Sequence, residues 1–556
     1  MNNERQTKCY IFSVLLTDIY NPFPYTLSSL PFAPFSFLEK KKKKNMQRKK
    51  QKEGVVEEVG DQDYLTALPA PILCNILSFL STREAVKTSV LSSTWRNVWK
   101  TPNNLVLDAH NFLNPQQDAV TNISHHSSAT SSFKLKCDRT WAFLNRVNLY
   151  LLRLSQFDPN FRSKIENLSI CFTFRRGGHG CYDLAQWIGF ALDRKVDKID
   201  LCFSESHELS APSHGALLLF PCEVLLNKEF AFVNSCLKHV RLAHCALAPH
   251  PAFNPGFATI TTLDLHKVDL VGGEQVQVLL ASCHSLEWLR LSKCHNMGYL
   301  KIEYPSCQKL RHLSVNRCHK LKALVLRSSS LESMEYTGTW YMIETMFDTP
   351  NLKSYSCRMV LGSDQGGEMS QYSRLAIELP QLQTLFLECK CMLYVPVNTM
   401  ANSIVATFPN LRHLIITKEA VHQQNFCWIE IVLKGCPILT RLDLNIWTHM
   451  KFDVEFMATS WLQACPHSNL KEVTITGIRG HESEIEIAVY LLQNARELQK
   501  MIIDPRRRVY LGNGKWSSSQ VCQTWNNGGR QRLHHLLYQQ AQHLSSPVKF
   551  FFCCQP

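Results

Sequence analysis

The sequence predicts an α/β protein in which a small all-α bundle is followed by an irregular solenoid of stacked strands. Three observations predict this fold class. Apolar residues at helical spacing fill residues 64–99. A short apolar pattern recurs many times between residues 237 and 475. A strand–helix–strand pattern over residues 470–503 predicts a C-terminal cap that closes the solenoid.

Composition and charge describe an ordinary globular chain with a basic tail. Its 556 residues are 45% hydrophobic and 19% charged, and the length indicates several domains or one long repeat array. The net charge of +14 is uneven, because residues 1–52 hold 11 Lys and Arg against 3 acidic residues, a net +8. The basic character therefore belongs mostly to a tail, which gives little support for nucleic-acid binding.

Residues 1–60 are expected to be a disordered basic N-terminal tail, because Pro, Ser and Phe mix without a period before a run of lysines. Met46 lies inside the run, and a start there would remove the Phe/Pro stretch and the five-lysine block. A solvated tail is one interpretation. The other is a nuclear-localisation signal, which would comprise Lys40, Lys41, Lys42, Lys43, Lys44, Arg48, Lys49 and Lys50.

The 22 cysteines are scattered and mostly flanked by aliphatic residues, which predicts reduced, core-filling thiols in a nuclear or cytoplasmic protein. We expect no metal site, because no cysteine pair combines with histidines at zinc-ligand spacing. We also expect no membrane contact, since the longest N-terminal apolar run is far short of the ~20 residues a span needs. The sequence contains no hydrolase, zinc-protease or kinase signature, so we expect neither a cofactor nor catalysis.

The helical stretch predicts three short helices. Ser81 and Glu84 form a capping-box pattern that starts a second helix near Thr82, and either Ser92 or Ser93 can cap a third. Helices of three turns or fewer make only a small core and leave apolar surface over. We therefore expect this unit to be marginal alone and to have a protein partner.

Residues 61–102 closely resemble an F-box. The resemblance is carried by Leu68-Pro69, by residues 76–80, and by the Trp95-Arg96-Asn97-Val98-Trp99 end. It implies docking onto a Skp-type adaptor and, through it, onto the cullin of a cullin-RING ubiquitin ligase. The adaptor contacts implied are Leu68, Pro69, Ile72, Leu73, Ile76, Leu77, Val90, Leu91, Trp95 and Trp99. The alternative is that the leucines only fill the three-helix core.

Residues 103–160 are predicted to form a linker and a capping helix. Leu105-Val106-Leu107 predicts a strand, and the apolar spacing of residues 136–160 predicts a helix that packs against the start of the solenoid.

Residues 161–460 carry the repeat, apolar-x-x-apolar-x-apolar, whose spacing resembles that of leucine-rich repeats. The last two apolar positions alternate along a strand and point inward, so successive coils stack into a parallel sheet. Weaker copies begin at Ile165 and Val196. An extra copy at Leu321 follows its predecessor by only 11 residues, so the repeat pattern gives it no secure place, and we interpret it as padding on the convex side. The main copies, separated by 21–31 residues, begin at Leu237, Ile260, Leu286, Leu310, Leu331, Leu352, Leu382, Leu411, Leu439 and Leu470.

Outward residues on the concave sheet are the predicted contacts for a target protein. From the strand alternation we choose Arg241, His266, Arg290, Asn316 and Glu335. Ordinary solvated surface is the alternative for each of them. Three cysteines that follow a strand by three residues are predicted to be buried in tight turns, namely Cys245, Cys294 and Cys318.

Residues 461–512 resemble the FBD module that follows leucine-rich repeats in plant F-box proteins. The resemblance lies in the Leu470–Ile475 strand, the acidic helix that starts at Glu482, and the Leu498–Ile503 strand. We expect it to close the solenoid. Arg506, Arg507 and Arg508 are interpreted as a solvated end of this cap, and the alternative is that they contact phosphate. Residues 513–556 are predicted to hold a tail helix near residues 531–542.

These features predict a substrate-recruiting subunit of an SCF-type ubiquitin ligase that catalyses nothing itself. The F-box would hold the adaptor, and the repeats would hold an unknown target at high effective concentration. One alternative is a nuclear repeat scaffold or nucleic-acid-associated protein anchored by the basic tail. Another is a free-standing scaffold whose F-box has lost its partner.

Overall fold

The chain divides into two units, Met1–Ala67 and Leu68–Pro556, and every described residue belongs to the second. The computed structural model describes residues 68–113, 129–157, 164–174, 180–204, 217–224, 236–248, 257–338, 343–359, 367–389, 407–420, 428–448, 464–522 and 525–553, with short gaps inside some of these ranges. The predicted tail and all the nuclear-localisation residues lie outside the described residues.

The second unit begins with a small helical module, in which α3 (Ala70–Ser78), α4 (Thr82–Lys87), the 3₁₀ turn η1 (Thr88–Val90) and α5 (Trp95–Val98) follow one another. The N–H of Ile72 donates to the Pro69 carbonyl over 2.9 Å, so the first helix begins after the proline. Helix α4 begins at the predicted Thr82, while Ser81 lies outside the described residues. Ser92 caps the third helix, because its Oγ accepts from the Trp95 N–H over 3.4 Å.

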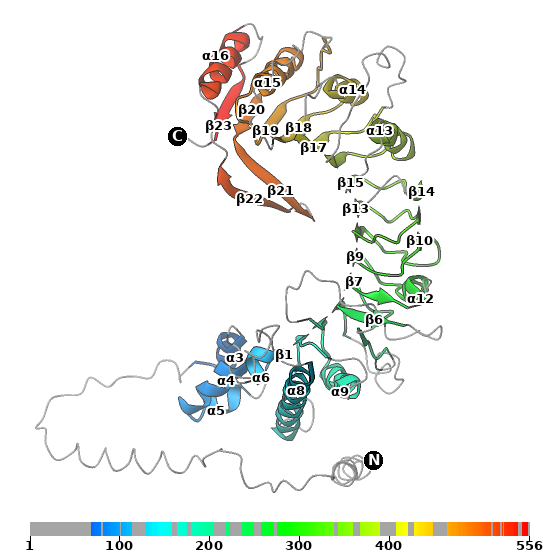
Figure 1. Ribbon diagram of the computed structural model, residues 1–556, viewed down its shortest axis with the longest axis vertical. Helices are drawn as coiled ribbons and strands as arrows, with labels where there is room; N and C mark the ends of the chain where they lie inside the picture. Colours follow the sequence, from blue (N-terminus) through cyan, green and yellow to red (C-terminus); the bar gives the residue numbers. More distant parts are fainter. Residues whose placement is uncertain are drawn as a thin grey trace, which may run out of the picture. The chain divides into compact units, whose positions relative to one another are not determined.

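A parallel sheet of fifteen strands forms the body of this unit (Figure 1). Every neighbouring pair within it is parallel, which is the pairing that stacked coils produce. Its strands, in spatial order, are β1 (Asn104–Asp108), β2 (Asn167–Cys171), β3 (Lys198–Cys202), β5 (His239–Ala243), β7 (Thr262–His266), β9 (Trp288–Ser292), β11 (His312–Asn316), β13 (Ser333–Gly338), β15 (Ser354–Met359), β16 (Thr384–Cys389), β17 (His413–Ala420), β18 (Arg441–Thr448), β19 (Glu472–Thr476), β20 (Lys500–Asp504) and β23 (Lys549–Phe552).

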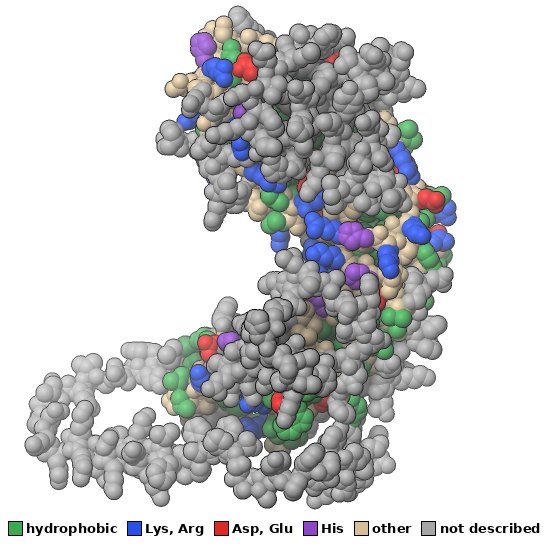
Figure 2. Space-filling model, viewed as in Figure 1, with side chains coloured by type: hydrophobic (Ala, Val, Ile, Leu, Met, Phe, Trp, Pro, Cys, Tyr) green, Lys and Arg blue, Asp and Glu red, His purple; other side chains and the backbone are tan. Residues whose placement is uncertain are grey.

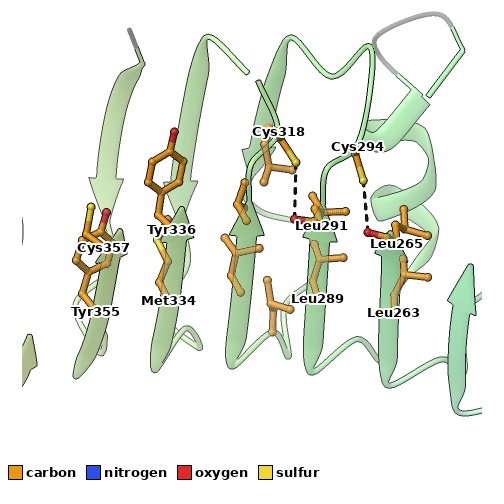
Figure 3. Packing of buried hydrophobic residues seen from close by; sticks show 14 of the residues in the cluster. Leu263, Leu265, Leu289, Leu291, Cys294, Cys318, Met334, Tyr336, Tyr355 and Cys357 are labelled. Atoms are coloured by element: carbon orange, nitrogen blue, oxygen red, sulfur yellow. Dashed lines mark hydrogen bonds between the residues drawn. The ribbon is translucent and has the colours of Figure 1, made fainter. Parts of the chain in front are cut away.

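The strands coincide with the predicted copies, including the weaker copies at Ile165 and Val196 and the strand at residues 105–107. Their inward residues stay in register from coil to coil, as Leu263, Leu289, Leu313 and Met334 illustrate. These four side chains are at most 1% exposed and form part of one continuous core. Figure 3 labels three of them, Leu263, Leu289 and Met334. Burial of this repeated apolar row is what holds neighbouring coils together.

Two small sheets accompany the main one. The first joins β10 (Tyr299–Ile302), β12 (Ala323–Arg327) and β14 (Glu344–Asp348), and the second joins β4 (Leu218–Leu219), β6 (Cys245–Leu247) and β8 (Asp269–Leu270). The extra copy at Leu321 is therefore strand β12 of a separate sheet, which explains its short spacing. Its inward residues, Leu324 and Leu326, are fully buried in the shared core.

Helices take the place of these small sheets nearer the two ends of the unit (Figure 1). The predicted helix at residues 136–160 is the longer α8, and its Phe143 ring stacks on that of Phe172 with centroids 3.9 Å apart. The other helices are α6 (Ala109–Phe112), α9 (Gly180–Asp193), α12 (Gln275–Ser282), α13 (Gly367–Glu378), α14 (Trp428–Gly435), α15 (Glu482–Asn494) and α16 (Gly529–Ala541), and α8 spans Ala129–Phe157.

The three predicted cysteines are buried, although Cys245 lies in strand β6 and not in a turn. Cys245, Cys294 and Cys318 are 0%, 2% and 7% exposed. The thiol of Cys294 lies 3.5 Å from the Leu265 carbonyl oxygen, and that of Cys318 lies 3.7 Å from the Leu291 carbonyl oxygen (Figure 3). Burial raises the pKa of the Cys245 thiol, so this cysteine is an unreactive packing residue.

The C-terminal region differs from the prediction in two ways. Strands β19 and β20 continue the main sheet, and β23, which lies in the region predicted to hold only a helix, adds a further strand beyond them. Residues 506–522, expected to include a solvated arginine end, form an antiparallel hairpin of β21 (Arg506–Gly512) and β22 (Lys515–Cys522). The predicted cap is thus a continuation of the solenoid that carries an inserted hairpin.

Candidate functional site

The helical module has a small core and much exposed apolar surface. Its buried core consists of Leu73, Leu77, Trp95 and Val98. Around it Ile72, Ile76, Leu80, Val86, Val90 and Leu91 are at least 36% exposed, and Val90 and Leu91 reach 68% and 62%. Single exposed leucines are common on protein surfaces, but six exposed aliphatic side chains in so short a module make it a candidate docking surface.

The ten predicted adaptor contacts separate into two groups. Leu73, Leu77 and Trp95 are interior, which corrects the expectation of direct surface contact for these three, because the module needs them to fill its own core. The remaining predicted contacts are partly or fully accessible, and they are Leu68, Pro69, Ile72, Ile76, Val90, Leu91 and Trp99.

The polar face of the main sheet, meaning the face opposite the leucine core, carries a pocket of about 390 Å³. Strands β5 to β15 and the residues that directly follow them supply its lining. In Figure 2 Lys, Arg and His side chains gather over the middle of the unit, where Figure 1 draws β7 to β15. The lining residues are Arg241, Asp264, His266, Arg290, Ser292, Lys293, Asn316, Arg317 and Arg358.

Strand register explains why these residues meet. Asp200, Arg241, Asp264 and Arg290 are paired across four adjacent strands in one row. His266, Ser292 and Asn316 form the next row toward the strand ends. Because the side chains of paired residues in a parallel sheet stand on the same face, each row presents its polar groups side by side.

Four of the five predicted target contacts line this pocket, namely Arg241, His266, Arg290 and Asn316. The fifth, Glu335, is engaged elsewhere, because its Oε1 accepts a hydrogen bond from the Tyr510 hydroxyl over 2.6 Å and its Oε2 lies 3.4 Å from the Ser314 hydroxyl. The role of the four in target binding remains a prediction.

Charges in the pocket are only partly compensated. Arg241 donates to both carboxylate oxygens of Asp200 over 3.1 and 3.2 Å and lies 3.7 Å from Asp264, while Arg358 pairs with Glu388. Burial raises the pKa of the Asp264 carboxyl. Within the part of the chain that the structure describes, no carboxylate forms an ion pair with Arg290, Lys293 or Arg317.

The surroundings of the two histidines are electropositive. Burial, followed by neighbouring positive charges that include Lys267 and Lys293, lowers the pKa of His244 to about 4. Burial, with His244 and Lys293 next, lowers the pKa of His266 likewise to about 4. Both imidazoles are therefore neutral at pH 7.

The turn that follows each of four successive strands holds a basic residue in the left-handed backbone region. The residues are His244, Lys267, Lys293 and Arg317, with φ between 50° and 58°. Each N–H donates to a carbonyl of the next coil, at 3.0, 2.8, 2.7 and 2.6 Å respectively. This regular hydrogen bonding fixes the left-handed backbone, although Gly or Asn adopts it more readily.

The hairpin β21–β22 lies against the polar face beyond the pocket (Figure 1). Phe386 of β16 contacts the rings of Tyr510 and Trp516 with centroids 4.5 and 5.6 Å apart. Asn445 of β18 donates to the Arg508 carbonyl over 2.6 Å, and Arg358 donates to the Tyr510 carbonyl. Arg358 thus contacts both the hairpin and the pocket.

Sequence reasoning missed Asp264, Ser292, Lys293, Arg317 and Arg358 as lining residues. A signal was present for some of them, since His244, Lys267, Lys293 and Arg317 recur with the same steps as the repeat itself. No such periodicity marks Arg358. The only sequence feature that could have indicated the hairpin is the alternation of polar and apolar residues in the short stretch 506–522.

No described helix is both long enough and apolar enough to cross a membrane. Among the described residues no group of His, Cys, Asp or Glu side chains is arranged to hold a metal ion.

The fold and these two surfaces define a leucine-rich-repeat protein with an N-terminal F-box. The F-box domain family matches residues 65–107. The At1g61320/AtMIF1 leucine-rich-repeat domain family matches residues 160–531, which is more than half of the chain, and the protein belongs to that family.

Three similar proteins from Arabidopsis thaliana are named as F-box proteins, and two of the three names also include the leucine-rich repeat. The chain is 24% identical over 480 residues to a putative F-box/LRR-repeat protein, At5g54820, covering 83% of this chain and 93% of that protein. It is 22% identical over 468 residues to the FBD-associated F-box protein At5g38590, covering 79% and 93%. An F-box/FBD/LRR-repeat protein, At1g13570, is 29% identical over 231 residues, covering 41% and 44%.

Proposed function

We propose that this protein is the substrate-recognition subunit of an SCF-type cullin-RING ubiquitin ligase. The F-box module binds a Skp-type adaptor, and through it a cullin, while the polar face of the repeats binds a target protein for ubiquitination. The protein performs no chemistry itself and acts by raising the concentration of the target at the ligase. The nucleus, the cytoplasm or both are its proposed location.

The exposed apolar residues of the F-box module carry the proposal. Val90 and Leu91 adjoin at the end of η1, and both are more than 60% exposed. A soluble domain gains by covering such side chains, and burying an exposed aliphatic side chain stabilises a complex by roughly 1.5–3 kcal/mol. The match to the F-box family and the names of the relatives support the same partner class.

Co-purification with a Skp-type adaptor tests the proposal. The full chain is co-expressed with the adaptor, and the dissociation constant is measured for wild type and for Val90→Asp/Leu91→Asp. We expect the double variant to bind at least about 100-fold more weakly, because it loses two apolar contacts and buries two charges.

Leu149→Asp/Leu152→Asp is the matched control, since both leucines lie on α8 and are 55% exposed. It should bind the adaptor as wild type does. Wild-type protein that fails to bind any Skp-type adaptor, or a Val90/Leu91 variant that binds with unchanged affinity, would refute the proposed function.

A second candidate is a nuclear repeat scaffold or nucleic-acid-associated protein without ligase coupling, which the uncompensated Arg and Lys side chains of the pocket favour. It predicts retention on DNA or RNA that falls steeply with salt. If deletion of residues 1–52 abolishes this retention, the tail binds the nucleic acid. If a variant of the pocket abolishes it, the polar face of the sheet binds the nucleic acid.

A further inference from the structure

Two cysteines stand side by side on the polar face of the main sheet. Cys171 ends strand β2 and Cys202 ends strand β3, and the register of these parallel strands pairs the two residues directly. Among the strand pairings that the structure describes, no other pair consists of two cysteines. Both side chains are partly exposed, whereas Cys294 and Cys318 are buried in the core.

The backbone around the pair fixes its geometry. The residues on either side of each cysteine are buried, so the alternation of the strands turns both thiols toward the polar face. The Phe172 N–H donates to the Cys202 carbonyl over 3.1 Å and holds the two strands together beside the pair. Neighbouring strands lie roughly 4.7–4.9 Å apart, within the Cα separation of about 4.4–6.8 Å that a disulfide spans. A disulfide can therefore form without a change of register.

The two sulfurs contact each other and share one acceptor. The Sγ of Cys202 lies 3.3 Å from the Ser204 carbonyl oxygen, and the Sγ of Cys171 lies 3.8 Å from the same oxygen. The hydrogen bond from the Cys171 thiol has the largest effect on the pKa of Cys202. With the positive charge of Arg241 it lowers this pKa to about 6, although burial and the charge of Asp200 oppose the change. Cys202 is therefore mostly a thiolate at pH 7, and the thiolate is the nucleophilic form of cysteine.

We propose that Cys171 and Cys202 form a redox-active dithiol on the polar face, which hydrogen peroxide converts into a disulfide. Cys202 is the attacking residue and Cys171 the resolving residue. The inference does not depend on the proposed function. The pair occupies the same row as His266, so the disulfide forms on the face that carries the pocket, and it replaces an ionised sulfur near Arg241 with a neutral bridge.

The reaction has two steps. In the first, the Cys202 thiolate attacks one oxygen of the peroxide. The S–O bond forms, the O–O bond breaks and hydroxide leaves, which gives a sulfenic acid at Cys202. In the second, the Cys171 sulfur attacks the Cys202 sulfur. The S–S bond forms, the S–O bond breaks, and the departing hydroxide takes the proton that Cys171 loses. The two cysteines give up two electrons to the peroxide, and a dithiol reductant returns them by exchange.

Peptide mapping of the full chain tests the proposal. Reduced protein is treated with hydrogen peroxide, blocked with iodoacetamide and digested with trypsin without reduction. Cys171 lies in the tryptic peptide 165–175 and Cys202 in the peptide 199–228, and fragmentation distinguishes Cys202 from Cys222 of the same peptide. We expect the Cys171–Cys202 link to be at least about 10-fold more abundant than any other and to disappear with dithiothreitol. Peroxide-treated protein without this link would overturn the proposal.

Cys171→Ser keeps a hydroxyl that can donate to Cys202 but cannot form a disulfide. In this variant Cys202 should stop at the sulfenic acid, which dimedone labels, and no link should form. The matched control is Cys553→Ser, which changes another partly exposed cysteine and should leave the link at its wild-type yield. If Cys202 of the Cys171→Ser variant forms a link to another cysteine in the wild-type yield, the assignment of Cys171 is wrong.

The pH dependence of alkylation tests the role of Cys202 independently of its accessibility. The rate of its reaction with iodoacetamide should reach half its maximum near pH 6, whereas an ordinary cysteine does so near about pH 8.5. Cys171→Ala removes the hydrogen bond to Cys202, so this midpoint should rise, and Cys171→Ser should restore part of the shift. A wild-type midpoint near that of an ordinary cysteine, or one that Cys171→Ala leaves unchanged, would overturn the assignment of Cys202 as the attacking residue.

Discussion

The docking of the hairpin β21–β22 on the polar face can be tested by removing a single oxygen atom. Tyr510→Phe deletes the hydroxyl that donates to Glu335 over 2.6 Å. The aromatic contacts with Phe386 and Trp516 remain, since the ring is unchanged. The substitution therefore removes the hydroxyl contact between the hairpin and strand β13 and keeps the packing of the ring.

A hydrogen bond to a charged group contributes about 1.5–3 kcal/mol. Each 1.4 kcal/mol changes an equilibrium tenfold, so the local opening constant of the hairpin should rise by about 10- to 100-fold. Hydrogen–deuterium exchange of residues 506–522 measures that opening directly. Exchange of the amides of β17 and β18, which pair with each other along eight residues, should not change.

Tyr538→Phe is the control, because within the described residues the Tyr538 hydroxyl forms no hydrogen bond, while its ring packs 5.0 Å from that of Phe550. It should leave exchange in the hairpin as in wild type. If Tyr510→Phe changes hairpin exchange by less than about threefold, the Tyr510–Glu335 contact does not hold the hairpin, and the reasoning fails.

Two further predictions concern stability. The folded protein keeps His244 and His266 neutral to about pH 4, whereas an unfolded chain protonates them near pH 6.5, so their contribution to stability is present above pH 6.5 and is lost as the pH falls toward 4. Between pH 7.5 and pH 5 the melting temperature of His244→Asn/His266→Gln should therefore fall less than that of wild type, and identical pH profiles of the two proteins would contradict this. Gly477→Ala should lower the free energy of unfolding by at least about 2 kcal/mol, because φ is 78° and the added Cβ would collide with the Ile446 carbonyl oxygen. Denaturant titration measures this, and the control Gly298→Ala, where a Cβ meets nothing within 4 Å, should leave the free energy of unfolding nearly unchanged. Equal losses of unfolding free energy in the two variants would contradict the prediction.

The repeats could be predicted from sequence because their physics is local and repeated. The spacing of Leu263 and Leu265, or of Leu289 and Leu291, fixes two inward positions, and the next coil confirms them one repeat later. The helices of the helical module could also be predicted from local sequence, since Ser92 caps a helix whose Trp95 fills the core.

The apolar pattern could not separate contact residues from core residues in the F-box module. Leu73 and Ile72 are neighbours in sequence and equally apolar, but one is fully buried and the other 47% exposed. Only the packing of three helices decides which side faces inward.

Four of the residues that line the pocket were predicted as outward residues of the sheet, but the pocket itself was not predicted. Strand alternation placed Arg241 and Arg290 on the polar face, but the neighbours that complete the pocket depend on how coils of unequal length come into register. Arg358 lies on β15, far along the chain from Arg241, and it donates a hydrogen bond to the Tyr510 carbonyl of the hairpin. Long-range pairing of this kind leaves no trace in a short window of sequence.

The antiparallel hairpin enters and leaves the sheet at one point, because Arg506 pairs with Cys522 at its base. On either side of this insertion, β20 and β23 pair directly through Met501 and Phe550. A shorter or longer loop could therefore replace the hairpin without disturbing the stacked coils. The length of this one segment is therefore independent of the pairing that holds the scaffold beneath it together.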